Sequence, residues 1–200
     1  MGQTDQDNVL QMIRDGGMVG LRDLRERGLH PEHLRRLVAA GLIVRVARGV
    51  YALADAEPTS NHSLAQAAKQ VPRGVVCLLS ALRFHEVGTQ SPFEVWLAIN
   101  RRDRKPRVRS PLIRFVRFSG PAMTQGVEEH NLEGVSVRIY NVAKTVADCF
   151  KYRNKIGLDV AIEALREGLR DHRFTRDDLW WYAKVCRVTT VIRPYMEATA

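Results

Sequence analysis

The sequence lacks long hydrophobic runs, a secretory leader and paired cysteines. No stretch reaches the roughly 18 uninterrupted apolar residues that a membrane-spanning helix needs. The opening residues, MGQTDQDNVL, lack the basic and apolar blocks of a signal peptide. The three cysteines, Cys77, Cys149 and Cys186, are odd in number, far apart and set among apolar residues, which favours neither a disulfide framework nor a metal knuckle. We therefore expect a cytoplasmic protein that contacts no membrane and keeps its thiols buried.

The sequence also lacks the motifs that hold cofactors and metals. Its glycines in GTQSP and LEGV are isolated turn residues, and no GxxxxGK phosphate loop is present. The histidines His62, His85 and His130 follow neither an HExxH nor a His-x-His spacing. We expect no cofactor and no metal ion.

Catalytic patterns are equally weak. Ser80, His85 and Glu86 in SALRFHE would share one local helix, and no GxSxG elbow is present to expose a nucleophile. Structural capping or surface roles are therefore favoured over a catalytic triad for these three residues.

Three acidic residues of the C-terminal half, Asp148, Asp159 and Glu163, could form the carboxylate cluster of a nuclease. No carboxylate–lysine signature links them, and helix-surface salt bridges such as Asp159 with Lys155 explain them more simply. The sequence predicts a protein that is not an enzyme, and a metal-dependent nuclease is the weakest of the hypotheses.

Positive charge is plentiful but concentrated in one segment. The chain carries 31 Lys and Arg against 22 Asp and Glu, a formal net charge of +9. Residues 101–118, RRDRKPRVRSPLIRFVRF, hold 8 basic and 1 acidic side chain and so supply +7 of that charge. The segments 1–56, 57–100 and 119–200 are each within one charge of neutral. One short segment therefore dominates the electrostatic field that an acidic partner would meet.

Three short helices followed by a hairpin are expected in the first 54 residues. Apolar residues at helical spacing in QDNVLQMIRD, LRDLRERG and HPEHLRRLVAAG are each followed by a glycine that ends the helix. LIVRV and VYAL then alternate around Ala47, Arg48 and Gly49, where glycine permits a tight turn. This order of elements predicts a winged helix-turn-helix.

The third helix and the hairpin, or wing, would present basic side chains to DNA. Leu34, Leu37 and Val38 are expected to face the core, and the opposite face is small and basic, as in a helix that enters the major groove. The wing would lie along the phosphate backbone. The predicted DNA-binding residues are His33, Arg35, Arg36, Arg45 and Arg48. The alternative is that these are ordinary solvated charges on a small module of nearly neutral charge.

A break in apolar periodicity at ADAEPTSN, residues 54–61, predicts a short linker between a domain at 1–54 and a second at 55–200. After it we expect a helix in HSLAQAAKQV and an apolar run, GVVCLLSAL, that turns from strand to helix. Strands FEVWLAIN, PLIRFVRF and VSVRIY follow, and the rest is helical from VAKTVADCF onward. The predicted fold class is α+β: an N-terminal winged helix-turn-helix followed by an α+β domain with a small sheet and C-terminal helices.

The last two helices carry specific expectations. TRDDLWWYAKV should begin with a capping pair of Thr175 and Asp178, and TVIRPYMEA should bend or begin at Pro194. Because Trp180, Trp181 and Tyr182 are consecutive on a helix, at least one is expected to be exposed or at an interface. Packing between the C-terminal helices is the alternative.

Three blocks of the sequence, RLVAAGLIVRVARGVYAL, SALRFHEVGTQSP and VAKTVADCFKYRNKIGLDVAIEALREGL, resemble successive blocks of the AbiEi family. The resemblance extends from residue 18 to residue 187 and rests on the order and spacing of the blocks. It implies a winged helix that binds the double-stranded DNA of its own promoter and represses its operon. It also implies a C-terminal domain that counteracts a nucleotidyltransferase-like toxin in a type IV toxin–antitoxin system, as used in phage defence. Carried onto this chain, the basic positions are Arg35, Arg36, Arg45 and Arg48.

Two hypotheses of different class follow. The chain is either an autorepressor and antitoxin that acts on its toxin functionally or also by contact, or a stand-alone winged-helix regulator whose C-terminal domain binds a ligand or dimerises. An adjacent reading frame that resembles a nucleotidyltransferase would favour the first.

The basic run between two predicted strands is the second candidate contact region. A loop there would be exposed, and its dense charge would favour nucleic acid or the toxin as a partner; the alternative is a flexible surface loop without a role. The residues concerned are Arg101, Arg102, Arg104, Lys105, Arg107 and Arg109.

Overall fold

The structure is a computed structural model that describes residues 2–199, with side chains from residue 4 onward. The chain divides into two compact units. Unit 1 comprises Met1–Arg73, Pro106–Ile113 and His130–Val137, and unit 2 comprises Gly74–Lys105, Arg114–Glu129 and Arg138–Ala200. Unit 1 also contains two segments from later in the chain, so the two units are not continuous stretches of sequence. The predicted division into domains 1–54 and 55–200 stays a prediction.

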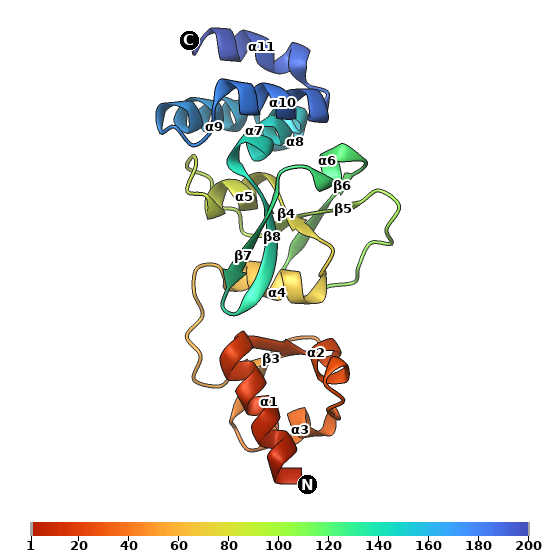
Figure 1. Ribbon diagram of the computed structural model, residues 1–200. Helices are drawn as coiled ribbons and strands as arrows, with labels where there is room; N and C mark the ends of the chain where they lie inside the picture. The colour runs from red at the N-terminus through yellow and green to blue at the C-terminus, as the bar shows by residue number, and fades with distance from the viewer. Residues whose placement is uncertain (1, 200) are drawn as a thin grey trace. The chain divides into compact units, whose positions relative to one another are not determined.

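Unit 1 begins with a winged helix-turn-helix (Figure 1). Its elements are α1 (Gly2–Gly16), β1 (Met18–Gly20), α2 (Leu21–Glu26), α3 (Glu32–Ala39), β2 (Ile43–Ala47) and β3 (Val50–Leu53). The strands form an antiparallel sheet in the order β1-β3-β2. The predicted three helices and hairpin are confirmed, whereas β1 was missed because three residues are too few to show a period.

The core of the winged helix is apolar and comes from all three helices and the sheet. Helical spacing in α1 places its apolar side chains on one face, where they meet residues from α2, α3 and β2. The buried residues of this cluster are Val9, Met12, Ile13, Val19, Leu24, Leu34, Leu37 and Ile43. The same unit contains helix α4 (His62–Gln70), which confirms the helix predicted in HSLAQAAKQV.

The second sheet has five strands in the order β6-β5-β4-β8-β7. Strand β4 pairs antiparallel with β5 and parallel with β8, where Val76 is opposite Ile139. The strands are β4 (Val75–Val76), β5 (Val95–Asn100), β6 (Ile113–Phe118), β7 (Val127–Leu132) and β8 (Val135–Tyr140). The strands predicted in GVVCLLSAL, FEVWLAIN, PLIRFVRF and VSVRIY are confirmed. Strand β7 was missed because VEEHNL carries mostly polar side chains.

The remaining regular elements of unit 2 are helices (Figure 1). They are α5 (Leu78–Phe84), α6 (Pro121–Thr124), α7 (Val142–Lys151), α8 (Arg153–Ile156), α9 (Leu158–Arg170), α10 (Arg176–Cys186) and α11 (Thr189–Glu197). Helix α7 packs against α5, α9 and α10, and α10 packs against α11. The predicted α+β fold class is confirmed. None of the described helices is long and apolar enough to cross a membrane.

The ends of the last two helices test the predicted signals. The capping pair is confirmed: the Asp178 N–H donates to Thr175 Oγ1 at 3.1 Å, and the Thr175 N–H donates to Asp178 Oδ2 at 3.0 Å. Pro194 lies inside α11, which begins at Thr189, so a start at Pro194 is wrong. Trp181 is 57% exposed while its two aromatic neighbours are half-buried, which confirms that the triplet cannot all be covered.

Candidate nucleic-acid interface

Helix α3 is short and turns two basic side chains to solvent. Leu34 and Leu37, one turn apart, are buried in the core, and Arg35 and Arg36 between them are exposed. The predicted core position of Val38 is wrong, since this residue is 40% exposed. Val38 lies at the edge of the apolar stripe, one residue before the helix ends, where it meets solvent.

The two arginines of α3 differ in how they are held. Arg35 Nη1 lies 3.6 Å from Glu32 Oε2, an ion pair between exposed groups that contributes little and can open. Within the described residues, no ion pair or hydrogen bond engages the guanidinium of Arg36. Arg36 is therefore the cation of α3 that is freest to meet a ligand.

His33 does not lie on the outer face of α3. Its Nε2 is 3.7 Å from Asp5 Oδ2 on α1, and its Nδ1 is buried without a hydrogen-bond partner in the described structure. The predicted exposure of His33 beside the arginines is wrong because α1 packs against α3 and covers this position. A DNA contact by His33 stays a prediction that its orientation disfavours.

The wing joins β2 to β3 through a turn at Arg48 and Gly49. Gly49 has a φ of +72°, a left-handed conformation that strains other residues, so the predicted need for glycine is confirmed. Arg45 and Arg48 are both exposed, and Arg45 Nε donates a hydrogen bond to the Ala47 carbonyl at 3.2 Å. The Leu21 N–H at the start of α2 donates to the Gly49 carbonyl at 3.2 Å, which ties the wing to the helices.

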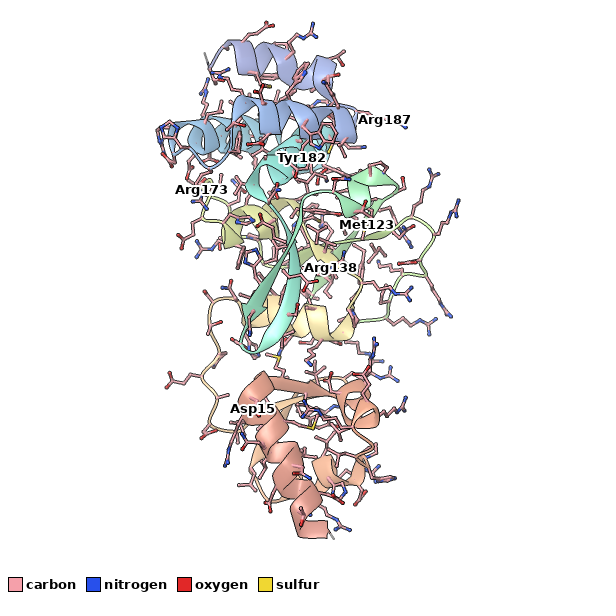
Figure 2. All side chains as sticks on the ribbon, in the orientation of Figure 1. Asp15, Met123, Arg138, Arg173, Tyr182 and Arg187 are labelled. Carbon is pink, nitrogen blue, oxygen red and sulfur yellow. The ribbon has the colours of Figure 1, made fainter. Side chains whose placement is uncertain are left out.

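The loop between β5 and β6 carries the basic run. Figure 2 shows nitrogen-tipped side chains projecting from this loop. Arg117 on β6 fixes its first turn, since Arg117 Nη1 donates hydrogen bonds to three backbone carbonyls, one at the end of β5 and two in the loop. The acceptors are Asn100 at 2.9 Å, Arg101 at 3.3 Å and Asp103. All six predicted contact residues are exposed: Arg101, Arg102, Arg104, Lys105, Arg107 and Arg109.

Two of the residues considered for catalysis, Ser80 on α5 and His85 just after it, make hydrogen bonds within the fold. Ser80 Oγ accepts a hydrogen bond from the Trp96 N–H at 2.9 Å, and His85 Nε2 lies 2.8 Å from the Tyr140 carbonyl. These contacts are structural, and the absence of a catalytic role for Ser80 and His85 stays a prediction. Among the described residues, no group of three or more His, Cys, Asp or Glu side chains could hold a metal ion.

Asp148 lies in the core, whereas the sequence predicts a position on a helix surface. Its Oδ2 is 2.5 Å from Lys144 Nζ, and both side chains are at most 1% exposed. Cys186 Sγ donates to the other carboxylate oxygen at 3.1 Å, and the ammonium of Lys144 lies 4.2 Å from the centre of the Tyr140 ring. Burial raises the pKa of Asp148, although the neighbouring Lys144 opposes the rise. The pair is enclosed in the core of unit 2.

The predicted surface pair of Asp159 with Lys155 is also wrong. Gly157, with a φ of +100°, separates α8 from α9, so the two residues do not share a helix and lack the one-turn geometry. Lys155 Nζ instead lies 5.6 Å from the centre of the Tyr152 ring.

Sequence reasoning missed a group of four basic residues in unit 2. They line one hollow, together with the exposed Trp181, and are Arg117, Lys151, Lys184 and Arg187. Three of the four cations lie in the segment 119–200, whose acidic and basic residues nearly balance, so a charge count along the chain could not reveal them. Folding brings them together from β6, α7 and α10.

The order α1-β1-α2-α3-β2-β3 defines the N-terminal module as a winged helix-turn-helix. Residues 9–54, which cover this module from the middle of α1 onward, match the family model described as a transcriptional regulator, AbiEi antitoxin. The match confirms the predicted resemblance to the AbiEi family over the winged helix. Over the remainder of residues 18–187 the resemblance stays a prediction.

A solved structure extends the similarity in fold beyond the winged helix. The chain resembles the crystal structure of RV2827C protein from Mycobacterium tuberculosis with a TM-score of 0.59, over 90% of this chain and 71% of that chain. The two sequences are 15% identical, so the likeness concerns the fold alone. No curated protein matches the chain.

Proposed function

We propose that this chain is a DNA-binding transcriptional autorepressor and the antitoxin of a type IV, AbiE-like toxin–antitoxin system. Its partner would be a nucleotidyltransferase-like toxin, counteracted functionally or also by contact. The observation that carries the proposal is the match of residues 9–54 to AbiEi antitoxin regulators on a module with exposed arginines on its third helix and wing. The protein acts by binding, without catalysis and without a cofactor.

In this proposal α3 enters the major groove of the protein's own promoter. Arg36 and Arg35 meet base edges or phosphates there, and Arg45 and Arg48 meet the backbone along the wing. A single winged helix covers a short half-site, so an inverted repeat in the operator would engage two copies.

The basic loop supplies a second contact in the proposal. The winged helix is nearly neutral, so it lacks the long-range attraction to phosphate that sustained binding requires. We assign residues 101–109 to the flanking DNA. The competing assignment is an acidic surface of the toxin or the nucleic acid on which the toxin acts.

Two measurements on the full chain test the proposed function. In a gel-shift titration the protein should bind its own promoter more tightly than a scrambled duplex of equal length, at fixed salt. In a co-expression growth test it should restore growth to cells that make the nucleotidyltransferase-like toxin. Promoter binding without growth rescue would favour the stand-alone regulator, and the absence of both would refute the proposal.

A further inference from the structure

A hollow of about 600 Å³ in unit 2 is built from cations and aromatic rings. It is lined by residues of β6, α6, the end of α7 and the C-terminal half of α10. Its cations are Arg117, Lys151, Lys184 and Arg187, and Trp181 and Tyr152 contribute aromatic rings. Among the described lining residues there is no aspartate or glutamate. Cations grouped on the wall of one hollow favour an anion as its occupant.

Two of these cations have no evident task in the fold. Lys151 Nζ donates to the Cys186 carbonyl at 2.9 Å, and Arg117 holds the first turn of the basic loop. Within the described residues, by contrast, the side chains of Lys184 and Arg187 engage no ion pair, hydrogen bond or ring. These two side chains are therefore available to a ligand.

The backbone at Arg187 provides an independent observation. Figure 2 labels Arg187 at the end of α10. Its backbone is left-handed there, with a φ of +58°, a conformation in which glycine or asparagine would be unstrained. A long cationic side chain at this position is not needed to end the helix. Left-handed residues other than glycine are found at helix ends and also at functional sites, and this one lies on the wall of the hollow.

We propose that this hollow binds a nucleotide, with its base stacked on Trp181 and its phosphates held by Lys184 and Arg187. A nucleotide is the ligand class that joins a planar aromatic face to a dense negative charge, which is the combination that the walls complement. The volume lies within the range of small-molecule sites. Trp181 is 57% exposed, so its ring can receive a base without rearrangement of the core.

The nucleotide is the end of an unpaired nucleic-acid strand. Arg117 both lines the hollow and hydrogen-bonds the first turn of the basic loop, so positive charge continues from the hollow to Arg101 and its neighbours. A strand could follow this track with its backbone phosphates while its last base enters the hollow. A free nucleotide would use the same chemistry but would fill the hollow alone.

Fluorescence anisotropy with a labelled oligoadenylate tests the site in the full-length protein. Trp181→Ala should weaken binding about tenfold, and Trp181→Phe should retain most of the affinity because a ring is still present. Lys184→Ser with Arg187→Asn should weaken binding. The slope of log affinity against log salt should also flatten by about 0.7 for each phosphate that the variant no longer neutralises. Arg83→Ser with Arg166→Ser, exposed arginines outside this hollow, changes the net charge equally and should leave affinity unchanged.

Competition distinguishes the two sources of the nucleotide. Displacement by unlabelled oligoadenylate but not by adenosine monophosphate supports a strand end, and displacement by the mononucleotide supports a free nucleotide in the same site. The proposal is overturned if the wild-type protein binds neither, or if Trp181→Ala and the Lys184 and Arg187 variant bind like the matched control. Circular dichroism verifies folding. Promoter gel shifts of Trp181→Ala should be unchanged, so failure here leaves the proposed repressor function standing.

Discussion

The winged helix and the helical part of unit 2 use their charged residues in opposite ways. In the described part of the winged helix, no charged side chain is buried, and the core is apolar. Unit 2 encloses Lys144 and Asp148 among its helices, with the Cys186 thiol on the carboxylate. The arginines of α3 and the wing in the first region are exposed and can meet ligands, whereas the buried charges of the second are committed to each other.

This difference separates the expected effects of substitution. Removal of an exposed arginine should change binding and leave folding intact, because its guanidinium is solvated by water in the folded protein. Removal of one buried charge should change the free energy of unfolding, because the remaining charge has no compensation. The following experiments test that separation, from the largest expected effect to the smallest.

The buried pair should give the largest effect. Lys144→Met should lower the free energy of unfolding by about 3–5 kcal/mol, because Asp148 would be left buried without its partner. Urea denaturation followed by circular dichroism measures the change. Replacement of both residues, Lys144→Met with Asp148→Leu, should recover much of the loss, since no lone charge then stays in the core. A single variant as stable as wild type would show that the pair is not an interacting ion pair.

The exposed arginines of α3 and the wing should change binding without changing stability. Arg36→Ala with Arg48→Ala should weaken promoter affinity more than tenfold, since removing each phosphate or base interaction costs about 1–3 kcal/mol. Gel-shift titration at fixed salt measures the affinity, with the Arg83 and Arg166 variant as the charge-matched control. Unchanged affinity in a folded double variant would remove this face from the DNA site.

The basic loop should contribute evenly to all DNA sequences. Serine at Arg101, Arg102, Arg104 and Lys105 should lower affinity for promoter and scrambled duplexes alike. The slope of log affinity against log salt should flatten by about 0.9 for each phosphate that the loop no longer neutralises. An unchanged slope combined with failed growth rescue would assign the loop to the toxin or its nucleic acid. A variant normal in both assays would leave the loop without either role.

The cap of α10 should give the smallest effect. Thr175→Ala should cost about 1 kcal/mol of stability, and Thr175→Ser should cost less because its hydroxyl can still accept the Asp178 N–H. Hydrogen bonds from Thr175 lower the pKa of Asp178 in the folded state. The stability that the ionised Asp178 carboxylate contributes is therefore fully present above its ordinary pKa of about 4. It is lost as the pH falls through the lowered pKa of the folded state. Thermal melting at neutral and acidic pH should show a smaller difference between wild type and Thr175→Ala in acid.

The elements of the winged helix could be predicted because each has a local signal. Glycines end its helices and form its wing, and apolar spacing identifies three short helices. Which residues of a helix face outward could not be predicted equally well. His33 is covered by α1 and Val38 is uncovered, because these outcomes depend on the neighbours of α3 and not on its own period.

Local sequence patterns could not predict the buried ion pair or the hollow of unit 2. A lysine and an aspartate four residues apart, as in Lys144 and Asp148, fit an exposed helix as well as a buried one, and burial is decided by the helices that pack around them. The cations of the hollow come from three elements far apart in the sequence. The exposed ring of Trp181 was the one part of that site with a sequence signal, three consecutive aromatic residues on a helix.

The hydrogen bonds of Arg117 have a consequence for the speed of association. Because the first turn of the basic loop is already ordered, a nucleic acid that arrives there need not wait for that backbone to fold. The conformational entropy lost by that part of the backbone on binding is reduced accordingly. The N–H groups of Arg101 and Asp103 donate to the Phe118 and Asn100 carbonyls at 2.7 and 3.0 Å, so their hydrogens should exchange slowly even in the free protein. Encounter would then be limited by diffusion and charge, and would slow steeply as salt is added.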